Sequence, residues 1–135
     1  MYVFDYPYRI RYADTDKMGY LYYGNYAMLY EIGRTESLRS LGTSYKDLED
    51  SGIMLPVYDL KSSFIKPALY DEELVIKTII KTLPTVRIHF RYEIFKKGND
   101  LINIGETTLV FVDTKTMKPC KPSAQILDAL LPHFS

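Results

Sequence analysis

The sequence has few of the features that mark several common classes of protein. Its 135 residues include one cysteine, two histidines and no tryptophan. The single thiol, Cys120, cannot form a disulfide within the chain, so we expect a reducing compartment, the cytoplasm. No apolar run approaches the ~18 residues of a membrane-spanning helix, and residues 1–5 lack the basic and apolar regions of a signal peptide. We therefore expect neither a membrane span nor a signal peptide.

An excess of one charge is also absent. Lysine plus arginine and aspartate plus glutamate each number 17, which gives a net charge of zero. A protein that binds nucleic acid usually carries a strong basic excess, so we do not expect a nucleic-acid partner. Hydrophobic residues make up 47% of the chain, enough for a sizeable core, and its length fits one domain over residues 1–135.

One long helix is the most distinct predicted element. We predict it over residues 25–41, with Asn25 as the N-cap, because the side-chain oxygen of asparagine can accept a hydrogen bond from a free backbone N–H. Gly42 suits the left-handed residue that follows the last turn. Gly33 costs about 1 kcal/mol relative to alanine inside a helix, so we expect another segment to approach the helix backbone closely at that position.

The two halves of this helix differ in polarity. Residues 26–32 are apolar nearly all round, which predicts burial on every side. Arg34, Glu36 and Arg39 follow, so we expect the second half to emerge toward water. The start of the helix should therefore point into the molecule.

Extended segments account for most of the remaining chain. Strands are predicted over residues 3–12, 53–65, 73–82, 86–94 and 101–113, and short helices over residues 44–49 and 123–131. Pro7 marks the first strand as an edge strand or a bulge. The last strand has four apolar residues of one parity, which predicts the face it buries: Ile102, Ile104, Val110 and Val112.

The order of these elements indicates the class of fold. Strands that follow one another, rather than alternate with helices, indicate an α+β fold with an antiparallel sheet. A sheet of about five strands wrapped round one central helix leaves its edges open. Pairing with a second copy would cover an edge, so we expect at least a homodimer.

A loop with two aspartates precedes the long helix. Its sequence, Asp14-Thr15-Asp16-Lys17-Met18-Gly19, has the spacing of the start of an EF-hand loop. An EF-hand needs a ligand at its fifth position and a glutamate at its twelfth, where this chain has Met18 and Asn25. His89 and His133 lie far from the loop and from each other in sequence, so we expect no metal site.

Other nucleophilic chemistry has little support. The G-x-S-x-G motif of serine hydrolases is absent from the sequence. Cys120 lies in a segment rich in lysine and proline, with no histidine nearby in sequence. His89 falls on the polar face of a predicted strand, where a surface or interface position is more common than a catalytic one.

A carboxylate close to a helix N-terminus can act on a carbonyl group. The first N–H groups of a helix are unpaired and partly positive, so they can stabilise an oxyanion. A nearby carboxylate can attack the carbonyl or activate water as a general base. Thioesters suit this arrangement, because thiolate is a good leaving group. Taken alone, the loop is explained more simply by two aspartates, Asp14 and Asp16, that turn the chain.

Residues 12–26 taken together resemble the signature of the 4-hydroxybenzoyl-CoA thioesterase family, the hotdog-fold acyl-CoA thioesterases. The shared pattern is D-x-D-x-x-G-x-(apolar)-x-(Y/H)-x-x-Y, leading into the long helix. Residues 67–72 are similar to the family's turn into its third strand. Residues 112–119, followed by Pro122, are similar to its last strand and C-terminal loop. The resemblance covers nearly the whole chain.

The resemblance implies a fold, an activity and a site. The fold is a long helix wrapped by a five- to six-stranded antiparallel sheet, with active sites at a dimer interface and dimers that often pair into tetramers. Asp16 matches the catalytic carboxylate, as nucleophile or general base, and Asp14 is then structural. Tyr23 takes the position of a tyrosine or histidine beside the reacting centre. Backbone N–H groups around Tyr23 and Gly24 would form the oxyanion site, and no metal or organic cofactor is needed.

The implied substrate is a small or medium acyl-CoA, whose phosphates need cations. The candidates lie on a strand face and in the late loop: Arg87, Arg91, Lys118 and Lys121. Ordinary solvated surface charge would also explain them. Two alternatives stay open, namely acyl carrier protein as the thiol carrier and a hotdog module that binds acyl-CoA or a partner protein without hydrolysis. A hotdog dehydratase is less expected, because no histidine lies near the start of the helix.

Overall fold

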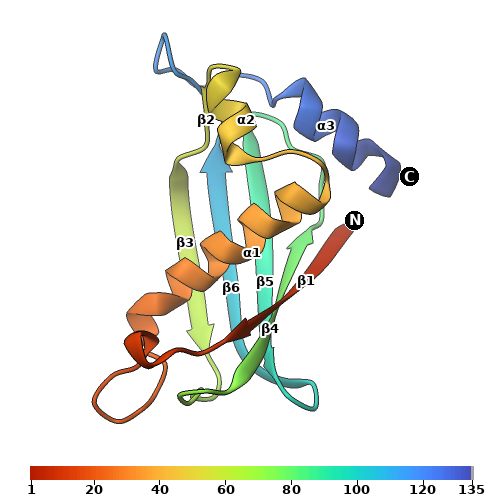
Figure 1. Ribbon diagram of the computed structural model, residues 1–135. Coiled ribbons are helices and arrows are strands. Elements are labelled where there is room, and N and C mark those ends of the chain that lie inside the picture. Colours follow the sequence, from red (N-terminus) through yellow and green to blue (C-terminus); the bar gives the residue numbers. More distant parts are fainter. Residues whose placement is uncertain (135) are drawn as a thin grey trace.

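A five-stranded antiparallel sheet curls round one long helix, as Figure 1 shows for the computed structural model, which describes residues 1–134. The strand order is β1-β4-β5-β6-β3. The strands are β1 (Tyr2–Arg9), β3 (Val57–Phe64), β4 (Glu73–Ile80), β5 (Arg87–Lys96) and β6 (Asp100–Val110). The helices are α1 (Tyr26–Ser40), α2 (Tyr45–Asp50) and α3 (Ala124–Leu130), and a two-stranded sheet pairs β2 (Ile53–Met54) with β7 (Val112–Asp113). The predicted α+β class is confirmed.

Three short 3-10 helices complete the chain. They are η1 (Tyr12–Asp14), η2 (Tyr23–Asn25) and η3 (Leu131–His133). The first two flank the loop that carries Asp16, which lies at the end of the molecule where α1 begins (Figure 1). Every helix among residues 1–134 is too short or too polar to cross a lipid bilayer.

Helix α1 lies directly on the sheet because glycines allow close contact. A Cβ added at Gly33 would lie 2.5 Å from Thr78 Oγ1 and 2.8 Å from Ile76 Cγ2 of β4. The predicted close approach at Gly33 is therefore confirmed. Gly105 of β6 similarly leaves room for the ring of Tyr30, which stacks on Tyr92 with centroids 4.5 Å apart. The helix is thus held at a fixed height over β4, β5 and β6.

The polarity prediction for α1 is wrong for the first half and for Arg34, whereas Arg39 in the last turn is exposed as predicted. Ala27, Met28 and Glu31 in the first half are exposed, so that half has an outward face. Arg34 in the second half is buried, with 8% of its surface exposed, and its Nε donates to the Tyr45 hydroxyl at 3.0 Å. Burial of Arg34 follows from the position of α2, whose tyrosine supplies a polar partner inside the fold.

Several strand predictions also need correction. The run predicted as one strand over residues 53–65 forms β2 and β3, and the run over 101–113 forms β6 and β7, with each pair divided between two sheets. The first strand ends at Arg9 rather than at residue 12, because residues 12–14 turn into η1. In β6 the buried residues include Asn103 and Thr107, whereas Ile104 is only half-buried. The polar pair is tolerated inside because Asn103 Nδ2 donates to the Ser63 carbonyl at 3.0 Å and Thr107 Oγ1 lies 2.6 Å from the hydroxyl of Tyr92.

The two edges of the sheet differ in what they expose. Strand β1 pairs only with β4 and contains Pro7, which confirms its prediction as an edge strand. At the other edge, every residue of β3 except Ser62 is exposed. Strand β3 therefore presents a full-length unpaired edge that begins at Val57 and ends at Phe64.

Candidate active site

Asp14 closes the base of the loop. Its Oδ2 accepts hydrogen bonds from the Tyr8 hydroxyl at 2.7 Å and from the Arg11 amide at 2.9 Å. Its carbonyl accepts from Asn25 Nδ2 at 2.8 Å and from the Tyr22 amide at 3.0 Å. Burial, together with the neighbouring Asp14 carboxylate, raises the pKa of Tyr8 to about 12. Asp14 is buried, and the bonds to its Oδ2 and its carbonyl tie β1, η1 and the start of α1 together.

Asp16 is held differently, at the exposed turn of the same loop. Its Oδ1 accepts from the Met18 amide at 2.9 Å and from the Tyr20 amide at 3.2 Å. Gly19, with φ of +79°, donates its amide to the Asp16 carbonyl at 3.0 Å and completes the turn. Among residues 1–134, Oδ2 of Asp16 has no hydrogen-bond or ion-pair partner. One carboxylate oxygen fixes the side chain and the other is free to react.

The start of the long helix is not capped as predicted. Asn25 has helical dihedral angles, and its side chain donates to the Asp14 carbonyl instead of accepting from its own helix. The preceding turn, η2, uses the amides of Asn25 and Tyr26, which donate to the carbonyls of Tyr22 and Tyr23. Within the described residues, the amides of Tyr23 and Gly24 donate to no acceptor. Two adjacent N–H groups are therefore available at the helix start.

Gly24 allows this arrangement for a steric reason. A Cβ at this position would lie 2.5 Å from Cε2 of the Tyr22 ring. The ring of Tyr22 in turn lies against that of Tyr23, with centroids 4.7 Å apart. The absence of a side chain at Gly24 thus lets an aromatic ring lie next to the unpaired amides.

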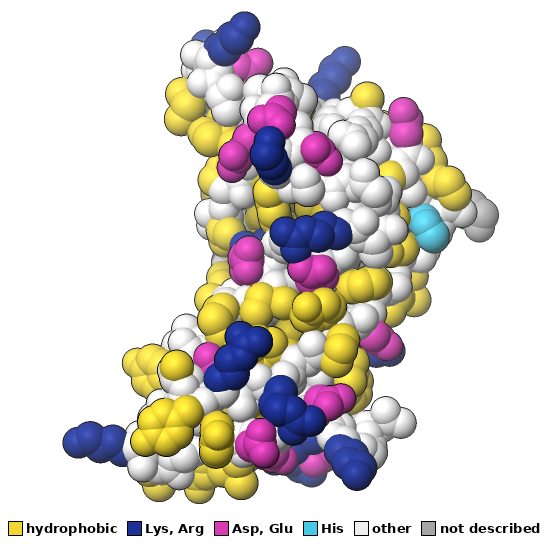
Figure 2. Space-filling view, in the orientation of Figure 1, with side chains coloured by type: hydrophobic (Ala, Val, Ile, Leu, Met, Phe, Trp, Pro, Cys, Tyr) yellow, Lys and Arg dark blue, Asp and Glu magenta, His cyan; other side chains and the backbone are white. Residues whose placement is uncertain are grey.

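A hollow of about 310 Å³ brings Asp16 and the helix start together. Its lining comes from the loop, α1 and the end of β3: Asp16, Tyr20, Leu21, Tyr23, Tyr26, Phe64, Ile65, Lys66 and Pro67. Phe64 meets the rings of Tyr23 and Tyr26 edge to face, with centroids 6.3 Å and 5.1 Å away. Figure 2 shows hydrophobic side chains gathered around this end of the molecule. The hollow combines one free carboxylate with a mostly apolar, aromatic wall.

Asp16 also borders a second depression on the other side of the loop. This one is larger, about 660 Å³, and is lined by Tyr12, Thr15, Asp16, Lys17, Gly19 and Tyr70. The rings of Tyr12 and Tyr70 meet edge to face at 5.8 Å. A molecule bound at Asp16 could therefore extend in two directions, one apolar and one more polar.

Within one chain, the four cationic side chains predicted to bind CoA lie away from Asp16. Arg87 covers the ring of Tyr58 at 4.4 Å and pairs in register with Val110, at the end of the sheet opposite to Phe64. Phe64 lies six residue steps along β3 from Tyr58, roughly 20 Å at 3.3 Å per residue. Arg91, in mid-strand, has its Nε 3.1 Å from Glu93.

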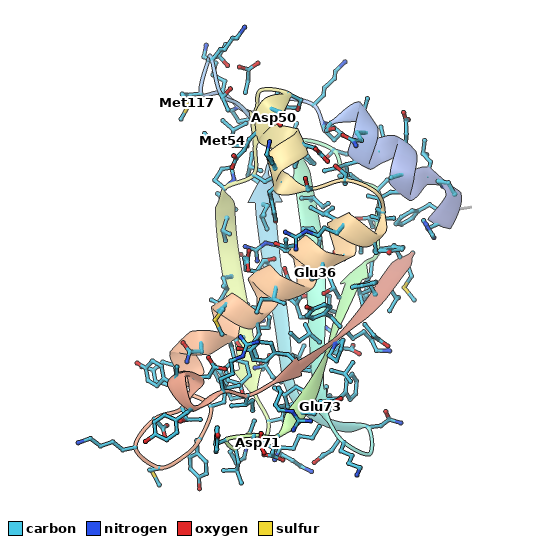
Figure 3. The ribbon with its side chains drawn as sticks, viewed as in Figure 1. Glu36, Asp50, Met54, Asp71, Glu73 and Met117 are labelled. Carbon is cyan, nitrogen blue, oxygen red and sulfur yellow. The ribbon has the colours of Figure 1, made fainter. Side chains whose placement is uncertain are left out.

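Lys118 and Lys121 are exposed in the segment after β7. Their neighbour Met117 lies with Met54 and Asp50 at one end of the molecule, whereas Asp71 and Glu73 lie at the other (Figure 3). Tyr70, next to Asp71, donates its backbone amide to the carbonyl of Gly19 at 3.0 Å, so the loop with Asp16 lies at the same end as Asp71. The two lysines therefore belong to the end away from Asp16.

The remaining candidates from the sequence play no visible part in this site. His89 Nε2 lies 3.8 Å from Glu106 on the half-exposed outer face of β5 and β6. Cys120 is half-buried beside β7, and burial raises the pKa of its thiol, which disfavours the thiolate. Residues 1–134 contain no cluster of three or more His, Cys, Asp or Glu side chains able to hold a metal ion. The prediction that no metal or cofactor is needed stays a prediction.

Of the residues that line the hollow, sequence reasoning identified only Asp16 and Tyr23; Tyr26 and Phe64 are among those it missed. Tyr26 is the last position of the D-x-D motif, so its spacing was a usable signal. Phe64 gave no local signal, because only the pairing of β3 with β6 places the end of β3 beside the start of α1.

Comparison with known proteins defines the class to which this fold and site belong. The family model described as Thioesterase-like superfamily matches residues 10–130. The chain therefore belongs to the thioesterase-like superfamily. The predicted hotdog fold and the predicted class of enzyme, a thioester hydrolase, are confirmed at this level.

Individual relatives agree with this assignment. The putative acyl-CoA thioesterase YneP of Bacillus subtilis is 34% identical over 110 residues, which cover 82% of this chain and 80% of YneP. The 1,4-dihydroxy-2-naphthoyl-CoA hydrolase of Thermosynechococcus vestitus is 26% identical over 104 residues, 76% of this chain and 71% of that protein. The crystal structure of a DHNA-CoA thioesterase from Staphylococcus aureus superposes with a TM-score of 0.85 at 36% identity, covering 99% of this chain and 87% of that one.

Proposed function

We propose that the chain hydrolyses the thioester of a small or medium acyl-CoA, with Asp16 as the catalytic carboxylate. The observation that carries the proposal is that Asp16, with its free Oδ2, and Tyr23 line one hollow, and that the amides of Tyr23 and of the adjoining Gly24 are unpaired within the described residues. In this arrangement the amides bind the thioester oxygen and stabilise the negative charge that develops there. Asp16 attacks the carbonyl carbon or removes a proton from the attacking water, and the CoA thiolate leaves.

The lining of the hollow favours a compact acyl group with aromatic character. Its volume of about 310 Å³ is at the low end of the ~300–1,000 Å³ that is typical of ligand pockets. Edge-to-face contacts among Tyr23, Tyr26 and Phe64 provide ring surfaces on which a planar group can pack. Two relatives described above are named for aromatic acyl-CoA substrates, in agreement with such a group.

A homodimer through β3 would complete the site. The exposed β3 edge can pair with β3 of a second copy, and antiparallel pairing would bring the Tyr58 end of one strand beside the Phe64 end of the other. The partner's Arg87 would then lie near the catalytic hollow and could bind the phosphates of CoA. Further pairing into tetramers and a cytoplasmic location remain predictions of the same proposal.

Replacing Asp16 by asparagine tests the catalytic role. We expect Asp16→Asn to lower kcat/KM by ~10²-fold or more on every acyl-CoA that the parent hydrolyses, because the positioned carboxylate is lost. Free-thiol release with a panel of aliphatic and aromatic acyl-CoAs measures this, with Asp128→Asn on the exposed face of α3 as the matched control. Unchanged hydrolysis by Asp16→Asn would refute the mechanism. Tight acyl-CoA binding without turnover in the parent would identify a binding module, and faster reaction of the same acyl group on acyl carrier protein would identify that carrier.

A further inference from the structure

The turn that leads into β4 is closed by the carboxylate of Glu72. Its Oε1 accepts a hydrogen bond from the Leu69 amide at 2.6 Å and lies 3.3 Å from Nζ of Lys96 in β5. The Glu72 and Lys96 side chains are 32% and 20% exposed, so water only partly screens this ion pair. Inside the turn, Asp71 has φ of +69°, a left-handed conformation that residues other than glycine rarely adopt. The turn therefore depends on these bonds to keep its shape.

This turn is joined to the loop that carries Asp16. Two hydrogen bonds and one antiparallel bridge connect residues 68–70 with residues 19–21: the Leu21 amide to the Ala68 carbonyl at 2.7 Å, the Tyr70 amide to the Gly19 carbonyl at 3.0 Å, and Tyr20 opposite Leu69. Leu69 is thus both the residue whose amide Glu72 binds and the residue that pairs with Tyr20. Asp71 and Glu73, which flank Glu72, mark the place of the turn in Figure 3.

Tyr20 in turn holds the carboxylate of Asp16. Its amide donates to Asp16 Oδ1 at 3.2 Å, and its carbonyl accepts from the Asp16 amide at 2.9 Å. The other amide that binds Oδ1, that of Met18, comes from within the loop itself. Tyr20 is therefore the residue through which the turn before β4 reaches the Asp16 side chain.

We propose that Glu72, supported by Lys96, is a positioning residue for Asp16. The inference rests on the proposed thioesterase function, in which Asp16 is the catalytic carboxylate. Glu72 fixes Leu69, Leu69 pairs with Tyr20, and the Tyr20 amide holds Oδ1 of Asp16 so that Oδ2 stays in place for the reaction. A displacement of about 1 Å at a reacting group can lower a rate ~10²-fold, so a residue that touches no substrate can still control the rate.

The first test removes the carboxylate. We expect Glu72→Ala to lower kcat on the acyl-CoA that the parent hydrolyses fastest by ~10-fold, because Asp16 is less well positioned. KM should change by less than about twofold, because Glu72 does not line the hollow that contains Asp16 and Tyr23. Glu72→Gln keeps an oxygen that can accept from the Leu69 amide, so it should recover most of the lost kcat.

Glu73→Ala is the matched control, because it removes the same charge from the next residue. Glu73 pairs with Arg9 at 3.0 Å and, within the described residues, accepts no hydrogen bond from residues 68–70. Its replacement should therefore leave kcat at the parent value. Lys96→Met removes only the ion-pair partner of Glu72 and should lower kcat by a smaller factor, which keeps the test decisive if Glu72→Ala does not fold.

A double variant separates positioning from a general loss of stability. Asp16→Asn removes the group that Glu72 positions, so adding Glu72→Ala to it should leave the residual kcat unchanged. A further fall of ~10-fold in the double variant, or the parent kcat in both Glu72→Ala and Lys96→Met, would overturn the inference and leave the thioesterase proposal intact. Absence of hydrolysis of every acyl-CoA by the parent would instead reject the proposed function itself.

Discussion

The start of α1 with the loop before it, and the rest of α1, treat polar groups in opposite ways. At its N-terminal end, one oxygen of Asp16, the amides of Tyr23 and Gly24 and the hydroxyl of Tyr26 are unpaired among residues 1–134. From Tyr30 onward the polar side chains that face the sheet have partners within the fold. Two buried hydroxyl groups, those of Thr43 and Thr78, have no partner within residues 1–134, so an unpaired group is not by itself the mark of a ligand site. What sets the start of α1 apart is that a carboxylate oxygen and two adjacent amides are open to a ligand in the same place.

Alkaline pH should weaken both regions, because each contains a buried tyrosine. Burial raises the pKa values of Tyr92 and Tyr26 from 10.0 to about 12, so the folded state keeps protons that the unfolded chain releases. Stability from these groups is complete below pH 10 and is lost as the pH rises toward 12. Each group then contributes a loss of up to about 1.4 kcal/mol per pH unit. Circular dichroism and tyrosinate absorbance should report one shared transition in that range, and early ionisation of all tyrosines without unfolding would contradict it.

A methyl group at Gly105 should disrupt the region from Tyr30 onward by crowding. The Cβ of Gly105→Ala would lie 2.6 Å from Cε1 of Tyr30, and the Tyr30 ring is held in place by Tyr92. We expect a loss of about 3 kcal/mol in the free energy of unfolding, at the upper end for overpacked cores. Urea denaturation measures this change. Unchanged stability of Gly105→Ala would show that the helix can move away from the sheet.

Asp14→Ala tests where the two regions meet. It removes the acceptor of the Tyr8 hydroxyl and the Arg11 amide, so we expect a loss of about 2 kcal/mol in stability. Asp14→Asn keeps one carbonyl acceptor and should cost less. Thermal unfolding of both variants measures the difference, and full stability of Asp14→Ala would show that the loop needs no anchor.

The sequence was sufficient to predict the loop, the helix and the class of fold. Two aspartates before a long helix that ends at Gly42 form a local pattern, and local patterns can be recognised without knowing the fold. The strand predicted from residue 86 is a second local pattern of this kind. Ile88, Phe90 and Tyr92 alternate with polar residues in the sequence, and all three are buried.

The errors arose where distant residues decide the outcome. Burial of Arg34 depends on Tyr45, and burial of Asn103 depends on Ser62 and Ser63. Asn25 had a good partner in its own helix but bonds the Asp14 carbonyl instead. A polar residue predicts solvent exposure unless another element supplies its hydrogen-bond partner inside the fold. Hydrophobic periodicity contains no information about that other element.

Pro7 has a consequence for how copies of this chain can join. A strand added alongside β1 would meet a proline, which has no N–H to donate, so that side of the sheet is a poor template for growth. Only the β3 edge of each subunit can then pair with another strand. Once two copies pair through β3, neither has a free β3 edge left for a third copy. If copies join through β3 as proposed, we expect them to stop at a closed pair instead of growing into a fibre.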